Sequence, residues 1–199
     1  MTDPTHTDAA GTTPQVDLPI TFRAFQELHA DAYYDYAYAC LDDATLAQDL
    51  VTDAFTELGA CWDRVLTHPQ PATHAWAALR HLVEVEREHV DRYRALSGRL
   101  MFSAALRLEK EPFLDDLTAS VNNLEAGIAL GEAIKNLTGA KFDVIVLRFI
   151  TGLTVARTAQ AMGIDQGTVK SLTTQARHKL EARLQSRRII SPGTTKDQE

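Results

Sequence analysis

The residues best suited to chemistry lie between positions 166 and 179, where hydrogen-bond donors recur at helical spacing. Side chains of this kind can bind phosphates and reach base edges in a major groove. We therefore expect a helix that binds nucleic acid, with an unrelated helical hairpin, or a similar module that binds only protein, as the alternatives. The outward positions carry amides, hydroxyls and cations, and no carboxylate: Gln166, Thr168, Lys170, Ser171, Thr174, Arg177 and Lys179.

The preceding residues predict the turn that would position this helix. Thr154 can cap a helix that carries the small residue Ala159 on its inner side, and Gly163 can end it because glycine adopts a positive φ easily. A second helix would then begin near Gln166. A helix, a tight turn and a second helix with a polar outer side together predict a helix-turn-helix. The inner side of the second helix would carry Val169, Leu172, Ala176 and Leu180.

Charge is divided unevenly along the chain. The 199 residues carry a net charge of -7, yet residues 141–190 hold nine Lys/Arg against three Asp/Glu. Residues 1–140 hold ten against twenty-two. This asymmetry indicates that the C-terminal part meets a polyanion and that the acidic front part meets something else.

The remaining sequence predicts an all-α protein of two small helical domains joined by a linker. Apolar residues recur with the helical period from Ile20 to Leu66, from about Thr73 to Leu96 and again from Leu124, and no strand-like alternation is found. The pair Pro69 and Pro71 breaks the first domain internally. We expect a disordered lead over 1–18, a first domain over 19–98, a linker over 99–123, the helix-turn-helix domain over 124–186 and a disordered tail over 187–199.

Two stretches resemble the extracytoplasmic-function (ECF) sigma factors of bacterial RNA polymerase. Val144–Thr154 (VIVLRFITGLT) and Gly163–Leu180 (GIDQGTVKSLTTQARHKL) are similar to the family's C-terminal domain. Ala47–Phe55 (AQDLVTDAF), followed by Trp62, is similar to its polymerase-docking helix. The resemblance covers roughly residues 20–96 and 124–184.

The resemblance implies a transcription initiation factor whose partners are core RNA polymerase and promoter DNA, with an anti-sigma factor as a further candidate. It places Asp49, Asp53 and Phe55 on the polymerase-binding helix, and a pair of carboxylates at i and i+4 suits a basic partner. The helix-turn-helix would read the upstream promoter element. The residues left to contact the melted element are Arg80, Arg87, Arg92 and Arg94.

Several positions depart from the family pattern. Thr52 replaces the docking glutamine, and Leu172 and Gln175 occupy positions that are arginine in the family, which lowers the expected affinity for the upstream element. The segment Glu84–His89 carries three carboxylates that would repel single-stranded DNA. The alternative is therefore a degenerate sigma-like regulatory protein that binds polymerase, an anti-sigma factor or another regulator without melting DNA.

Other classes of function find little support in the sequence. Glu86 and His89 form a single E-x-x-H pair, whereas metal sites in helical bundles need a second pair, so no metal, cofactor or small-molecule substrate is expected. No phosphate-binding glycine loop or nucleophile motif is found, and we expect no enzyme. Cys40 and Cys61 are expected to be buried free thiols. Without a membrane span or a secretory leader, the expected location is the cytoplasm.

Overall fold

The computed structural model describes residues 18–93 and 124–190, here called the N-terminal half and the C-terminal half. The described residues form helices joined by turns and contain no strand, as expected for an all-α protein. The linker expected over 99–123 lies outside them. The helices of the N-terminal half are α1 (Ile20–Leu41), α2 (Ala44–Ala60), α3 (Trp62–Leu66) and α4 (Pro71–Tyr93). Those of the C-terminal half are α7 (Leu124–Lys135), α8 (Ala140–Ile145), the π-helical turn η1 (Val146–Ile150), α9 (Val155–Met162) and α10 (Gln166–Ile190).

Local sequence signals set the helix ends of the N-terminal half. Asp42 adopts a left-handed conformation (φ 54°) that ends α1. The Asp43 carboxylate accepts the backbone N–H groups of Thr45 and Leu46 at 3.0 and 3.1 Å and so caps α2. The proline pair separates α3 from α4, and Pro71 is the first residue of α4, where its missing N–H costs nothing.

The helices of the N-terminal half enclose an aromatic core. The Phe55 ring meets the Phe22 ring edge-on and stacks on the Tyr33 ring, with centroids 6.3 and 5.4 Å apart. Trp62 and Trp76 complete the cluster, and the Trp62 indole N–H donates to the Thr21 hydroxyl at 3.0 Å. These rings join α1, α2, α3 and α4 into one bundle.

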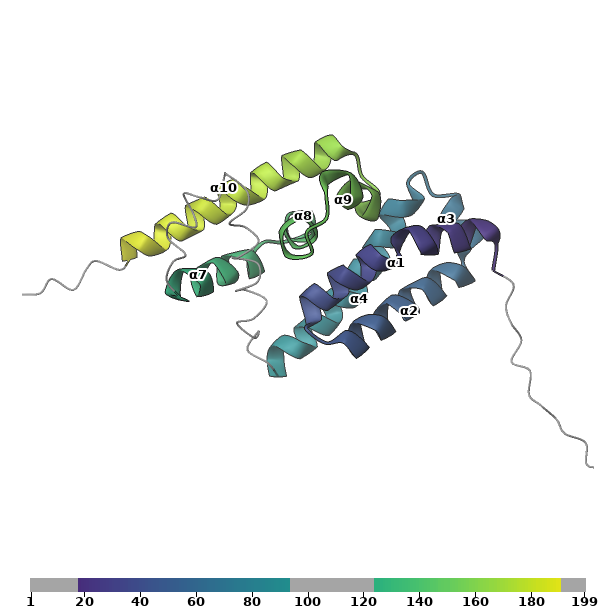
Figure 1. Cartoon of the computed structure of the whole chain (residues 1–199), viewed down its shortest axis with the longest axis horizontal. Coiled ribbons are helices and arrows are strands. Elements are labelled where there is room, and N and C mark those ends of the chain that lie inside the picture. The colour runs from purple at the N-terminus through teal and green to yellow at the C-terminus, as the bar shows by residue number, and fades with distance from the viewer. Residues whose placement is uncertain (1–17, 94–123, 191–199) are drawn as a thin grey trace, which may run out of the picture.

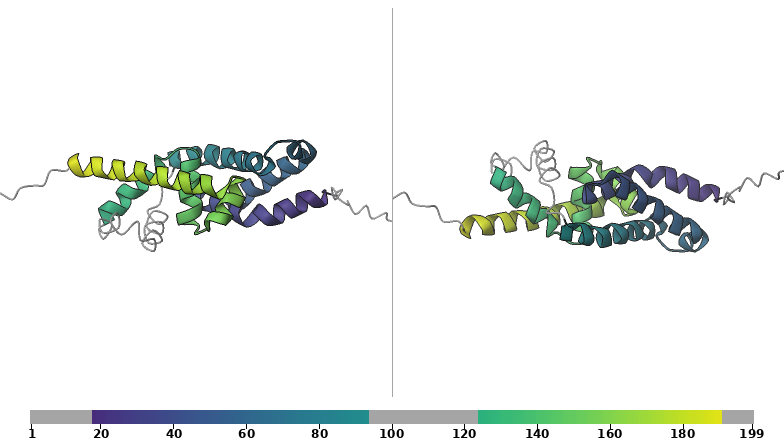
Figure 2. Two further views of the ribbon diagram at one scale, coloured as in Figure 1. Left: turned by 90° about the horizontal axis from the view of Figure 1, so that it is seen from above. Right: turned by 90° about the horizontal axis from the view of Figure 1, so that it is seen from below.

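The C-terminal half has a second core of its own. Helices α7 and α10 lie side by side at one end of the elongated molecule, away from α2 and α3 (Figures 1 and 2). Between α7, α8, η1 and α10 lies a cluster that is separate from the aromatic core. Its buried members are Leu130, Ala133, Ile134, Leu137, Ile145, Phe149, Ala176 and Leu180.

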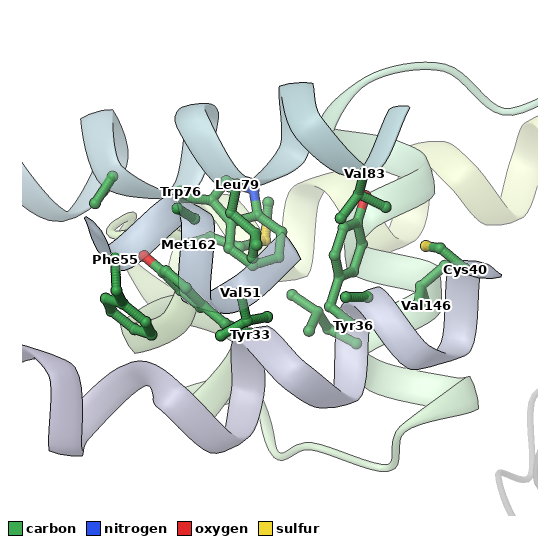
Figure 3. Packing of buried hydrophobic residues seen from close by; sticks show 14 of the residues in the cluster. Tyr33, Tyr36, Cys40, Val51, Phe55, Trp76, Leu79, Val83, Val146 and Met162 are labelled. Carbon is green, nitrogen blue, oxygen red and sulfur yellow. The ribbon is translucent and has the colours of Figure 1, made fainter. Parts of the chain in front are cut away.

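The two halves also pack directly on one another. Helices α8 and α9 and the turn η1 lie between the N-terminal bundle and α10 (Figure 1), and Val146 and Met162 enter the space between α1 and α4 (Figure 3). We call the contact of α8, η1 and α9 with α1 and α4 the docking interface. This contact could not be predicted from local sequence signals, because it joins residues that are about a hundred positions apart, such as Tyr36 and Asp143.

Two smaller expectations concern cysteines and membranes. Both cysteines are free; Cys40 is buried, whereas Cys61 is only half-buried because it ends α2 near the surface. Within residues 18–93 and 124–190, no helix has the length and apolar character needed to cross a membrane.

His29 makes folding stability depend on pH. Burial, with a smaller effect from the charge of Arg157, lowers the pKa of its imidazole from 6.5 to about 4. The folded protein therefore holds His29 neutral, so the contribution of this group to stability is complete above pH 6.5 and falls as the pH approaches 4. Between pH 7 and pH 4.5 this group alone should remove about 2 kcal/mol of unfolding free energy. Urea unfolding at both values should show a smaller loss for His29→Gln; an equal loss would contradict this assignment.

Candidate nucleic-acid interface

Helices α9 and α10 form the predicted helix-turn-helix. The Thr154 hydroxyl accepts the Arg157 backbone N–H at 3.2 Å and caps α9, as expected. Gly163 ends this helix in the left-handed region (φ 65°), and the Ile164 N–H then bonds the Ala159 carbonyl at 3.0 Å. The turn brings α10 across α9, with Ala159 buried at the crossing.

The outer side of α10 is open in the structure. Arg177 is half-buried and lies 3.2 Å from Glu181, one helical turn along. The inner positions Val169, Ala176 and Leu180 are buried, whereas Leu172 is only partly so. The predicted groove-facing residues are therefore presented to solvent on one helix, and their contact with DNA remains a prediction. The exposed members are Gln166, Thr168, Lys170, Ser171, Thr174 and Lys179.

Asp165 is a residue of this site that the sequence reading did not single out. Its carboxylate accepts the Thr168 N–H at 2.8 Å and the Thr168 hydroxyl at 2.5 Å, so it caps the start of α10. The hydrogen bonds from Thr168 hold the pKa of Asp165 below its usual value. An aspartate directly before a predicted helix was the available signal. Thr168 is thus engaged in the cap, which leaves Lys170 and Arg177 as the clearest candidates for phosphate contacts.

Helix α2 carries the residues expected to bind a protein partner. Asp49 and Asp53 are exposed one turn apart on its outer side. Phe55, which the resemblance placed on this helix as a polymerase-binding residue, is only 4% exposed and packs in the aromatic core, so its ring does not face a partner in this structure. Its role in this structure is to hold α2 against α1.

Two of the arginines expected to meet a melted strand contact the C-terminal half. Arg80 lies 3.8 Å from Asp143 and 3.7 Å from Glu84, and the Arg87 guanidinium lies 4.7 Å from the centre of the Phe142 ring. Both are half-buried beside α8, and their contact with DNA stays a prediction. The Arg92 side chain and Arg94 lie outside the described residues.

Comparison with known proteins agrees with this geometry. Residues 133–182 match the family model "Sigma-70, region 4". A relative, the ECF RNA polymerase sigma factor BldN of Streptomyces coelicolor, is 27% identical over 160 residues. The match covers 78% of this chain and 57% of that relative. Residues 133–182 are therefore similar to sigma-70 region 4, and the chain as a whole resembles an ECF sigma factor.

The region 4 match runs from the end of α7 into α10, and so contains α9, the Gly163 turn and most of α10. Within it, Gln175 donates to the Ser171 hydroxyl at 3.2 Å on the outer side of α10. On α2, the Thr52 hydroxyl donates to the Gln48 carbonyl at 2.8 Å and is turned toward its own helix. Gln175 and Thr52 occupy positions that are arginine and glutamine in the family pattern, and each makes a hydrogen bond within its own helix.

The acidic segment expected on α4 is present in the structure. Glu84 and Glu88 are exposed and Glu86 is partly so, with His89 3.8 Å from Glu86. These carboxylates give α4 a negative outer side. Among residues 18–93 and 124–190, no group of three or more His, Cys, Asp or Glu could hold a metal ion.

Proposed function

We propose that this chain is a transcription initiation factor that directs RNA polymerase to promoters. In this proposal α10 lies in the major groove of an upstream promoter element, and α2 binds the core enzyme. The chain spans 57% of the length of its relative BldN, a named RNA polymerase sigma factor, so the activity of that whole protein is carried over here as a proposal.

The observation that carries the proposal is the open outer side of α10. Lys170 and Lys179 are exposed and Arg177 is half-buried on a helix held by the Gly163 turn. The rest of the module is folded behind them, because Val169 and Ala176 are completely buried. A rigid helix that presents cations to solvent can bind phosphates without rearrangement.

Carboxylates on α2 are proposed to supply the contact with polymerase. Replacing Asp49 and Asp53 by Asn removes two exposed negative charges from one helix face and should weaken core-polymerase binding about tenfold. Retention of core polymerase on the immobilised chain measures this effect. The matched control, Glu27→Asn with Asp63→Asn, removes the same charge from exposed positions on α1 and α3. Equal retention by both double variants would remove α2 from the interface.

A second candidate function is a sigma-like regulator that binds polymerase, or an anti-sigma factor, without melting DNA. It is favoured by the negative outer side of α4 and by the inward contacts of Arg80 and Arg87. Three carboxylates beside a single strand oppose its binding.

One experiment separates the two candidates. Immobilised chain is first tested for retention of core polymerase, and the recovered complex is then supplied with promoter templates and nucleotides. Promoter-dependent transcripts support the initiation factor. Retained polymerase without transcripts would support the regulator.

A further inference from the structure

The buried residues of α10 fix which of its other residues face outward. Val169, Ala176 and Leu180 are at most 6% exposed and define the inner side of a helix that runs along one edge of the molecule (Figure 1). With about 3.6 residues per turn, the line directly opposite them passes through Ser171 and Thr174. Both are exposed. The centre of the outer side therefore carries small polar side chains, which allow a helix to lie deep in a groove.

The two flanks of this central line differ in chemistry. One flank carries Gln166, Lys170 and Arg177, and its two cations suit phosphates. The other flank carries the exposed, uncharged Gln175 beside Ser171. Phosphate contacts position a helix on DNA without carrying sequence information, whereas amides can distinguish bases. Gln175 is therefore placed to contact a base edge while the cationic flank contacts the backbone.

Two hydroxyls on the outer side form hydrogen bonds within the helix, and they do so in opposite ways. The Thr174 hydroxyl donates to the Lys170 carbonyl at 3.1 Å. The Ser171 hydroxyl instead accepts, because the Gln175 side-chain amide donates to its Oγ at 3.2 Å. Ser171 therefore anchors the amide that lies one helical turn along.

The anchored Gln175 amide keeps one donor and one acceptor for a ligand. A side-chain amide has two N–H donors and a carbonyl that accepts. Ser171 takes one N–H, which leaves the second N–H and the carbonyl. Adenine presents the matching pair in the major groove, an N7 acceptor beside an N6 donor. An amide that its own helix already holds also loses less conformational freedom on binding than a mobile one does.

The residue type at position 175 distinguishes adenine from guanine. Guanine presents two acceptors, O6 and N7, at its major-groove edge. The side chain of arginine offers donors alone and pairs with both of them. The Gln175 carbonyl needs a donor, which this edge of guanine lacks. Glutamine at this position therefore predicts a particular base preference, in addition to the lower affinity that follows from a missing positive charge.

We propose that Gln175, held by Ser171, is a specificity-determining residue that reads an adenine in the major groove of the upstream element. The inference rests on the proposed function, because it needs α10 to lie in that groove. It assigns separate tasks to the two flanks of one helix. Lys170 and Arg177 set the affinity through phosphates, and Gln175 sets the base that is preferred at one position.

Selection from random duplexes tests the base preference. The full chain, assembled with core polymerase, should enrich adenine at one position about tenfold or more over the other bases. Gln175→Glu leaves acceptors alone at this site and should shift the preference there to cytosine, whose N4 is a donor. The control, Gln185→Glu, adds the same charge at an exposed position about 15 Å further along α10 and should keep the adenine preference.

A base analogue tests the contact itself. 7-Deazaadenine lacks the N7 acceptor, so placing it at the selected position should weaken binding by the unmodified chain about fivefold, as measured by fluorescence anisotropy. The same analogue should have little effect on Gln175→Ala, which has already lost the contact. Equal weakening of both proteins would overturn the assignment, because the lost contact would then belong to another residue.

Ser171 acts as a positioning residue, and its variants distinguish this role from a structural one. Ser171→Ala should reduce the adenine preference severalfold while the salt slope and the melting temperature stay the same, since neither a phosphate contact nor a core residue is lost. Ser171→Thr keeps a hydroxyl and should restore the preference. An adenine preference that survives Ser171→Ala would overturn the positioning role.

The selection also separates this inference from the proposed function. An enriched sequence with the same base preferences for the unmodified chain, Gln175→Glu and Gln185→Glu would overturn base reading by Gln175 and leave the proposed function intact. No enriched sequence for the unmodified chain would contradict the proposed function, and the assignment of Gln175 would fall with it.

Discussion

Replacing both Lys170 and Arg177 by alanine should weaken binding to a cognate DNA duplex about ten- to a hundredfold. The slope of log affinity against log salt concentration should fall by about one unit for each lost phosphate contact. Both residues lie on the outer side of α10, and neither is part of a core. Arg177 also pairs with Glu181, but exposed pairs of this kind add little stability. The melting temperature should therefore remain nearly unchanged. Fluorescence anisotropy over a range of salt concentrations measures both quantities.

The control for this experiment removes two positive charges elsewhere. Arg23→Ala with Arg64→Ala changes exposed arginines on α1 and α3 and leaves α10 intact. It should alter affinity only through the net charge, with a much smaller effect on the salt slope. If the two double variants weaken binding equally, α10 does not lie in the groove.

Gly163→Ala should lower the free energy of unfolding by about 3 kcal/mol, since a side chain there meets both backbone strain and a steric clash. The residue has φ 65°, and an added Cβ would lie 2.3 Å from Thr73 N and 2.5 Å from the Ala72 carbonyl carbon. Backbone atoms at the start of α4 cannot move aside as a flexible side chain can. Urea unfolding followed by tryptophan fluorescence measures the loss.

Gly163→Asn separates the two causes of this loss. Asparagine tolerates the left-handed region better than alanine does, so it should recover about 1 kcal/mol of backbone strain while the clash persists. Both variants should therefore unfold at lower urea concentrations than the unmodified chain. A variant as stable as the unmodified chain would show that the turn does not lie against α4.

The helix-turn-helix was predictable because its signals are local. Thr154, Gly163 and the period of the buried residues on α10 lie within about thirty positions, and each has the conformation its residue type favours. The cap by Asp43 and the break at the prolines belong to the same class. Family resemblance and local chemistry gave the same answer here, and the match to sigma-70 region 4 confirmed it.

The docking interface could not be predicted, because it depends on pairs of residues that are far apart in the sequence. Nothing near Asp143 in the sequence indicates that Tyr36 and Trp76 will donate to its carboxylate. The contacts of Arg80 and Arg87 with α8 could not be predicted for the same reason. Phe55 lies on the expected helix, α2, but a motif position does not say which way a side chain points, and this ring is buried in the core.

The most direct measurement of the central claim is transcription by reconstituted core polymerase on a pool of genomic DNA fragments, with the transcript starts mapped. The account predicts starts that depend on this chain, that share one sequence element upstream, and that disappear when Lys170 and Arg177 are both replaced by alanine. Starts that are unchanged by the double replacement, or no chain-dependent starts at all, would contradict it.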